Sequence, residues 1–239
     1  MDDTPIVDTP NVFGVGAMQK MLNLEDAVLF ESDLRAVTPA QYAARDTAAA
    51  VRRLIRGLES TPASIDELSE LTNEIDRLVE VLAQRGSDSP VSSENTNVAY
   101  QAHRLRERSP FIGRANPVAL PLMVEFVEGG IDAIANFSTL YEGPPGCLHG
   151  GYIAGIFDEV LGAAQTYSGH AGMTGRLTVH YRSPTPLNTD LHLRARLESV
   201  SGRKILCKGT LHAGEVLCAE AEGLFIAIDP KKLLGLGEG

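Results

Sequence analysis

One stretch, residues 146–162, constrains the fold of this chain of 239 residues more than any other. The apolar side chains of this stretch and of the residues just after it recur at the three- and four-residue spacing of a helix that faces a core, and they are Ile153, Ile156, Phe157, Val160, Leu161 and Ala164. A second stripe on the same helix consists of Gly151, Gly155, Asp158 and Gly162. Interior glycines cost a helix about 1 kcal/mol each relative to alanine. Their alignment around one carboxylate predicts that another backbone or a ligand comes close to this face.

The expected helix begins near His149 and Gly150, after a glycine-rich loop. The first backbone N–H groups of a helix have no intrahelical acceptor and lie at the positive end of its dipole, so they can hold an anion or a developing oxyanion. Gly150 and Asp158 are eight residues apart, which is about 12 Å along a helix axis. If both act on one reacting carbon, the Gly150 N–H of one protomer must work with the Asp158 of another. A symmetric dimer with paired helices meets this condition.

Strand-like segments stand on both sides of the expected helix. The pair before it flanks the hairpin turn Glu128-Gly129-Gly130, and the later segments alternate apolar and polar side chains with a period of two. The expected strands cover residues 123–127, 131–140, 177–182, 191–198, 205–213 and 216–228, and the expected helix covers residues 149–167. Two strands, one long helix and four strands predict an α+β fold with an antiparallel sheet.

The N-terminal part, residues 1–97, has a different character and is interpreted as a helical extension with a linker. Thr38-Pro39-Ala40-Gln41 and Ser64-Ile65-Asp66-Glu67 are capping boxes that begin two helices. Leu68, Leu71, Ile75, Leu78 and Leu82 give the second helix an apolar stripe, and a helical hairpin packed on itself or on a partner protomer is expected. Residues 86–97 have the composition of a linker, which makes residues 98–239 the main domain.

Composition and charge exclude several classes of function. Residues 1–100 carry 8 Lys and Arg against 17 Asp and Glu, which argues against a nucleic-acid-binding arm. No apolar run approaches the length of a membrane span, and the first residues lack the pattern of a secretory signal. The 3 cysteines lack CxxC spacing, which favours reduced thiols over a disulfide framework or a zinc site. A cytoplasmic protein without a bound metal is therefore expected.

A family resemblance rests on His149-Gly150-Gly151, on Asp158, and on Thr174 sixteen residues later. This pattern, with the following segment 177–186, resembles hotdog-fold acyl-CoA thioesterases of the phenylacetate-degradation (PaaI) and THEM-type branch. The resemblance spans about residues 110–229. It implies a long central helix wrapped by a curled antiparallel sheet. It also implies two protomers with joined sheets and shared sites, either as a homodimer or as a dimer of dimers.

The resemblance also implies roles for individual residues. Asp158 corresponds to the general base or nucleophile, and the Gly150 N–H corresponds to the oxyanion donor from the partner protomer. Thr174 corresponds to the hydroxyl that holds the attacking water. His149 either orients the substrate carbonyl or the loop, or caps the helix. Gly151 either assists as a donor or permits close approach.

Basic residues near strand ends are candidates for contacts with the phosphates of coenzyme A. Arg182, Arg203 and Lys204 qualify by charge and position, although a solvated cation explains each of them as well. Cys147 precedes His149 by two residues, but a lone loop cysteine is a weak candidate for a nucleophile.

The sequence thus predicts an acyl-CoA thioesterase, active in fatty acid metabolism, that hydrolyses its substrate without a metal or redox cofactor. Two alternatives stay open. A hotdog hydratase or dehydratase would carry an Asp-x-x-x-x-His pattern, but Ala163 stands where that histidine would be. A non-catalytic acyl-CoA sensor or scaffold is the other, and the intact Asp158 argues against it.

Overall fold

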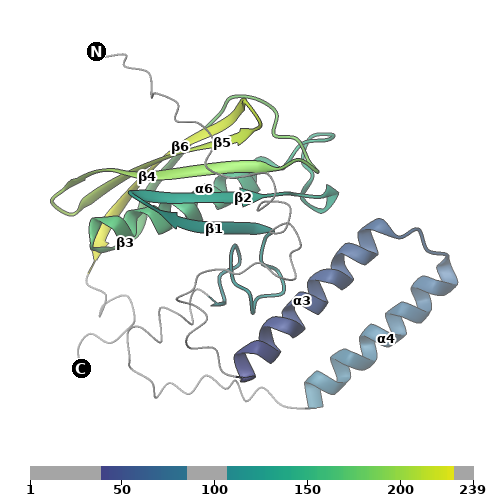
Figure 1. The fold of residues 1–239 in the computed structure, drawn as a ribbon. Coiled ribbons are helices and arrows are strands. Elements are labelled where there is room, and N and C mark those ends of the chain that lie inside the picture. The colour runs from purple at the N-terminus through teal and green to yellow at the C-terminus, as the bar shows by residue number, and fades with distance from the viewer. Residues whose placement is uncertain (1–38, 85–106, 229–239) are drawn as a thin grey trace.

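The computed structural model describes residues 39–84 and 107–228, and every structural statement below concerns these residues. Two helices come first, followed by an α+β domain (Figure 1). The elements are α3 (Pro39–Ser60), α4 (Ile65–Gln84), β1 (Leu122–Val127), β2 (Gly130–Ala135), η1 (Thr139–Tyr141), α6 (Gly150–Ala164), η2 (Gln165–Ser168), β3 (Ala171–Tyr181), β4 (Leu191–Ser201), β5 (Lys204–Ala213) and β6 (Val216–Ile228). The predicted linker at residues 86–97 lies outside the described residues.

The six strands form one antiparallel sheet in the order β1-β2-β4-β5-β6-β3. The strand that follows α6, β3, therefore pairs with the last strand and forms one edge of the sheet. This arrangement is a hotdog-like fold, with α6 as the central helix lying along one face of the sheet (Figure 1). The α+β hotdog prediction is confirmed.

Several predicted boundaries differ from the structure, and three of them have a local cause. The strand expected from residue 177 begins at Ala171, because Gly172 and Gly175 interrupt the visible alternation. The strand expected to reach residue 140 ends at Ala135, since Ser138 caps the short helix η1. The central α-helix ends at Ala164 rather than at residue 167, and a 3-10 turn continues the chain to Ser168.

The core forms between α6 and the sheet. All six residues of the predicted apolar stripe of α6 are buried. Opposite them lie buried side chains from the strands, among them Ile131, Leu193, Ala195, Cys207, Leu211 and Phe225. Burying one such aliphatic or aromatic side chain contributes about 1.5–3 kcal/mol, so α6 is held mainly by this contact.

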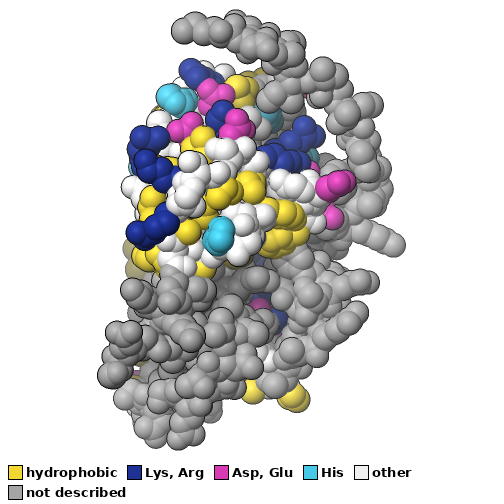
Figure 2. All heavy atoms as spheres, turned by 90° about the vertical axis from the view of Figure 1, so that its left-hand side faces the viewer, with side chains coloured by type: hydrophobic (Ala, Val, Ile, Leu, Met, Phe, Trp, Pro, Cys, Tyr) yellow, Lys and Arg dark blue, Asp and Glu magenta, His cyan; other side chains and the backbone are white. Residues whose placement is uncertain are grey.

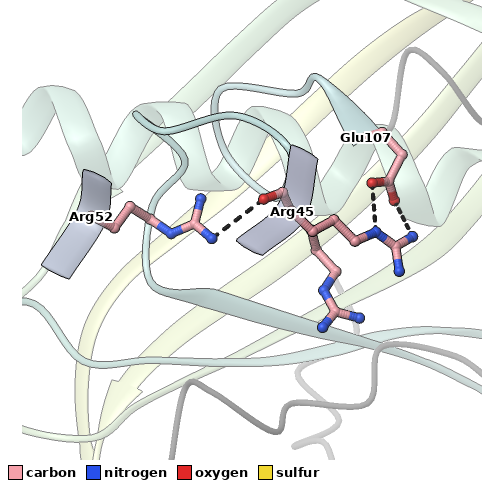
Figure 3. A network of polar contacts seen from close by, with 4 residues as sticks. Arg45, Arg52 and Glu107 are labelled. Carbon is pink, nitrogen blue, oxygen red and sulfur yellow. Dashed lines mark hydrogen bonds and ion pairs between the residues drawn. The ribbon is translucent and has the colours of Figure 1, made fainter. Parts of the chain in front are cut away.

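The helix α3 is fastened to the domain through the segment 107–121. Arg45 is 5% exposed and donates from Nε and Nη2 to the two carboxylate oxygens of Glu107, at 2.8 and 2.6 Å. Arg52 donates to the carbonyl oxygens of Asn116 at 2.6 Å and Arg114 at 3.3 Å. Figure 3 shows both arginines of α3 extending toward this segment. Segment 107–121 therefore lies between α3 and the domain.

At the end of α3 and at the start of α4, a glutamate carboxylate accepts hydrogen bonds from neighbouring groups. Glu59 accepts hydrogen bonds from Ser138 at 3.0 Å and from Thr139, and the Thr139 bond is the main cause of the lowered pKa of Glu59. At the start of α4, Glu67 accepts from the Ser64 N–H at 2.8 Å while the Glu67 N–H donates to Ser64 Oγ at 3.3 Å. The second predicted capping box is confirmed.

The apolar stripe of α4 is only partly covered, with Leu71 and Ile75 half-buried. No residue of α4 is buried, and Leu68, Leu78 and Leu82 are exposed. Neither α3 nor α4, nor α6, is long and apolar enough to cross a membrane.

We expect Arg45→Ala to lower the free energy of unfolding by about 3 kcal/mol, because it leaves the buried Glu107 carboxylate without its partner. Chemical denaturation measures the change. The control is Arg77→Ala, which removes an exposed ion pair with Glu74 on α4 and should change stability by less than about 0.5 kcal/mol. Equal effects of the two substitutions would contradict the role assigned to Arg45.

Burial also predicts the reactivity of the thiols. Burial raises the pKa of the Cys207 thiol from 9.0 to about 11, whereas Cys147 is only half buried. At about pH 8.5 an alkylating reagent should modify Cys147 in the folded protein and Cys207 only after denaturation. The Cys207 thiol stays neutral to a higher pH in the folded state than in the unfolded state. The free energy of unfolding should therefore fall as the pH rises from 9 toward about 11. Equal labelling rates of Cys147 and Cys207 in the folded protein, measured by peptide mass spectrometry, would refute the expected difference in reactivity.

Candidate active site

The loop before α6 is held by backbone hydrogen bonds and ends in a histidine cap. The His149 N–H donates to the Tyr141 carbonyl at 2.9 Å, and the Leu148 N–H donates to the Thr185 carbonyl at 2.8 Å. His149 has an extended backbone, and its Nδ1 accepts from the Gly151 N–H at 3.0 Å. An accepting Nδ1 places the imidazole proton on Nε2 in the neutral ring. His149 therefore acts as the N-cap and keeps only Nε2 for a ligand.

The start of α6 presents one backbone donor. The Gly151 N–H is used by His149, whereas the Gly150 N–H has no acceptor among the described residues. The Gly150 carbonyl accepts from the Tyr181 hydroxyl at 2.9 Å, which ties this peptide to β3. Gly151 permits the cap, since a Cβ there would lie 3.1 Å from His149 Nδ1. Of these two glycines, only Gly150 keeps an N–H that is free among the described residues and that could stabilise an oxyanion.

The carboxylate lies two turns further along α6. Asp158 is exposed, and its Oδ1 accepts a hydrogen bond from Thr174 Oγ1 at 2.9 Å. Thr174 stands on β3 opposite Phe225, next to a β-bulge. The sixteen-residue spacing read from the sequence therefore corresponds to a contact between the helix and the edge strand. Such a hydroxyl can orient a carboxylate or hold a water beside it.

One unbroken helix separates the donor from the carboxylate. Because α6 is continuous from Gly150 to Ala164, the two groups lie about 12 Å apart along its axis. Each group also touches β3, through Tyr181 and Thr174 respectively. One protomer therefore holds the free N–H at the start of α6 and the carboxylate near its middle.

One glycine of the α6 stripe, Gly155, faces a different group from the one expected. An added Cβ on Gly155 would lie 2.5 and 2.6 Å from two ring carbons of Phe111. The group that comes close is an aromatic side chain of segment 107–121, whereas the sequence had predicted a backbone or a ligand. Ser109 fixes this segment by donating to Glu159 at 3.3 Å and accepting from the Phe111 N–H at 3.1 Å. No local pattern in the sequence indicates that Phe111 reaches α6.

The three candidate phosphate contacts do not lie together. Arg182 pairs with Glu220 through Nε at 3.1 Å and through Nη2, at the Gly150 end of β3. Arg203 and Lys204 stand at the β4–β5 turn, near the strand ends beside Thr174, and Arg203 Nε donates to the Ala227 carbonyl at 3.2 Å. The face seen in Figure 2 carries Lys and Arg side chains around an apolar patch. Within residues 39–84 and 107–228, no group of three or more His, Cys, Asp and Glu could hold a metal ion.

The fold and the site together define a hotdog-type α+β protein whose helix start and mid-helix aspartate match the predicted motif. The family model described as "Thioesterase superfamily" matches residues 145–220, which include all four predicted catalytic positions. A crystal structure of a protein described as a thioesterase superfamily protein aligns with a TM-score of 0.67 and 31% identity, over 77% of this chain and 90% of that chain. This chain belongs to the thioesterase superfamily.

Two similar proteins show which branch of the superfamily this chain resembles. The chain is 40% identical over 91 residues to acyl-coenzyme A thioesterase THEM4 of Xenopus laevis, covering 37% of this chain and 41% of that protein. It is 37% identical over 95 residues to the protein of the same name from Mus musculus, covering 39% of this chain and 41% of that protein. The match therefore spans less than half of these relatives. The predicted resemblance to the THEM-type branch is confirmed.

Proposed function

We propose that this protein hydrolyses acyl-CoA thioesters to a carboxylate and free coenzyme A. The observation that carries the proposal is the arrangement on α6, where an unpaired Gly150 N–H begins the helix and Asp158 stands two turns later with a hydroxyl on its Oδ1. A thioester needs both a donor for its carbonyl oxygen and a base or nucleophile for its carbonyl carbon. The similarity to acyl-coenzyme A thioesterases supports the same activity.

The proposed chemistry uses only groups of this chain and water. Asp158 takes a proton from a water molecule as the water oxygen attacks the thioester carbon, and the electron pair moves to the carbonyl oxygen, where the Gly150 N–H stabilises it. Collapse of the intermediate breaks the carbon–sulfur bond, and the proton passes from Asp158 to the departing sulfur. Direct attack by Asp158, followed by hydrolysis of the anhydride, uses the same groups and yields the same products.

A dimer brings the two halves together in this proposal. The edge strand β3 spans 11 residues, and a long free edge favours pairing with another strand. Leu177 and Val179 pack against the core, and the exposed Tyr181 lies on the same side, since its hydroxyl donates to the Gly150 carbonyl. An antiparallel pairing of two β3 strands centred on Leu177 or Thr178 keeps these side chains on one face, and it sets Tyr181 opposite residues 173–175 of the second copy.

That register has a consequence for the proposed site. Tyr181 contacts Gly150 and Thr174 contacts Asp158, so the Gly150 of one copy comes beside the Asp158 of the other. The same pairing gathers Arg203 and Lys204 of one copy near Arg182 of the other, where they flank the entrance for coenzyme A phosphates. We therefore propose a homodimer as the minimal active unit and acyl-CoA as its substrate.

We expect Asp158→Asn to lower kcat by about 10²- to 10⁴-fold, because the amide can neither accept a proton nor attack. The substitution preserves size and can still accept the Thr174 hydrogen bond. A chromogenic assay of thiol release on a panel of acyl-CoAs measures the change. Cys147→Ala serves as the control and should retain activity. Near-normal turnover of Asp158→Asn would exclude the proposed role, and tight acyl-CoA binding without thiol release by the wild type would indicate a sensor instead.

A site shared between two protomers can be tested with a variant that lacks the Gly150 N–H. Gly150→Pro removes the N–H, and proline is suited to the first position of a helix after an extended residue such as His149. We expect it to lower kcat by about 10²- to 10³-fold, whereas Gly150→Ala keeps the donor and should remain active.

Mixing the inactive Gly150→Pro and Asp158→Asn chains after reversible dissociation should restore about a quarter of the wild-type activity. A mixed dimer contains one site with both intact groups, and half of the dimers are mixed. Absence of any recovery, with mixed dimers shown by mass spectrometry, would place the complete site within one chain.

A further inference from the structure

The ring of Phe111 fills a place on α6 that no side chain of the helix occupies. Residue 155 is a glycine, and a Cβ added there would lie 2.5 and 2.6 Å from the Cε1 and Cζ atoms of Phe111. The ring therefore stands where a side chain of residue 155 would be. Phe111 is half-buried and packs against the core of the domain, so part of its surface stays accessible to a ligand.

This place is next to the candidate carboxylate. Gly155 and Asp158 are three residues apart on α6, and side chains at that spacing are neighbours on a helix surface, with about 5–6 Å between their Cβ atoms. Asp158 is exposed and accepts the Thr174 hydrogen bond on its Oδ1. A group that extends from Asp158 toward the start of the helix therefore meets the Phe111 ring.

The other neighbour of Asp158 along α6 leaves space instead. Gly162 is four residues after Asp158, and a Cβ added there would meet only one ring carbon of Phe225 within 4 Å, at 3.9 Å. The two sides of the carboxylate are therefore unequal. An aromatic ring closes the side toward the start of α6, whereas a glycine leaves the side toward the end of α6 open.

The basic residues indicate which part of an acyl-CoA takes which side. Arg203 donates to the Ala227 carbonyl at 3.2 Å, and Ala227 pairs with Gly172, which lies beside the end of α6. Arg203 is thus on the open side of Asp158, and there the proposed dimer places the phosphates of coenzyme A. The coenzyme then leaves the carboxylate along the open side, and the acyl group points toward the Phe111 ring.

Hydrogen bonds hold the ring in this position. Ser109 accepts from the Phe111 N–H at 3.1 Å and donates to Glu159 of α6 at 3.3 Å. The Phe111 carbonyl accepts from the Leu120 N–H at 3.1 Å, which closes the segment on itself. An acyl chain that needs the space of the ring therefore has to break packing and hydrogen bonds to obtain it.

We propose that Phe111 determines the length of the acyl group, which makes short-chain acyl-CoA thioesters, of hexanoyl length or less, the preferred substrates. This inference rests on the proposed thioesterase function. A separation of about 5–6 Å between the neighbouring positions leaves room for a few methylene groups beside Asp158. A short chain gains apolar contact with the ring, whereas a longer one must displace it from a closely packed position or turn into water.

The experiment measures kcat/KM by thiol release on saturated straight-chain acyl-CoAs from acetyl to palmitoyl. We expect the wild type to have its optimum at hexanoyl or shorter and to lose at least about tenfold by dodecanoyl. Phe111→Ala opens the space and should move the optimum to a longer chain. Phe111→Leu should give a smaller shift in the same direction and preserves the test if the alanine variant does not fold. Phe111→Trp enlarges the ring and should move the optimum to a shorter chain.

A matched control separates the ring from the packing of its segment. Ile112 is the next residue and also packs against the core, so Ile112→Ala loosens the same segment without removing the ring. This variant should keep the chain-length optimum of the wild type even if its thermal unfolding midpoint falls. A shift of the optimum as large as that of Phe111→Ala would overturn the role of Phe111.

The remaining outcomes distinguish this inference from the proposed function. Thiol release with an optimum at a long chain in the wild type, or with the same optimum in all the Phe111 variants, would overturn the role of Phe111 and leave the thioesterase intact. If the wild type releases no thiol, the proposed function fails. Calorimetric binding of hexanoyl-CoA and dodecanoyl-CoA to the wild type and Phe111→Leu then decides whether the ring selects the chain, and an equal affinity ratio in the two proteins would refute it.

Discussion

The packing of α6 against the sheet is the interaction on which the rest of the structure depends. Its apolar stripe is buried against strands β2, β4, β5, β6 and β3, so the helix can neither rotate nor slide without exposing that stripe. Gly150 at its start and Asp158 on its exposed side are thereby held at fixed intervals along the helix. Because these intervals are set by the helical rise, the core packing also sets the spacing of the candidate chemistry.

The edge strand β3 contacts α6 at positions with a matching spacing. Tyr181 reaches the start of the helix and Thr174 reaches its middle, while Gly172 lies against Gln165. A strand rises about twice as far per residue as a helix, so one strand of eleven residues covers the whole of α6. Among the residues that the structure describes, the same strand forms one edge of the sheet. Substrate groups and a second protomer would thus meet the chain along one element.

The N-terminal helices are joined to this arrangement indirectly. Arg45 of α3 pairs with Glu107, and the segment that begins there lays Phe111 on Gly155 of α6. Asp158 lies one turn beyond Gly155, so segment 107–121 connects α3 to the neighbourhood of the carboxylate through a buried ion pair and one ring. Leu68, Leu78 and Leu82 of α4 stay exposed. In the described residues α3 is therefore packed on the domain, whereas most of the apolar stripe of α4 is not.

Periodic and local features could be predicted from the sequence. The apolar stripe of α6, the succession of strands and helix along the chain and the Ser64–Glu67 capping box depend on the spacing of neighbouring residues, which the backbone geometry of a helix or strand converts directly into structure. The sequence alone also determined that Gly150 and Asp158 cannot meet within one helix. Only the tertiary structure decided that Phe111 covers Gly155 and that Tyr181 bonds Gly150. Those contacts join segments far apart in the chain, and their formation depends on side-chain packing that no local pattern encodes.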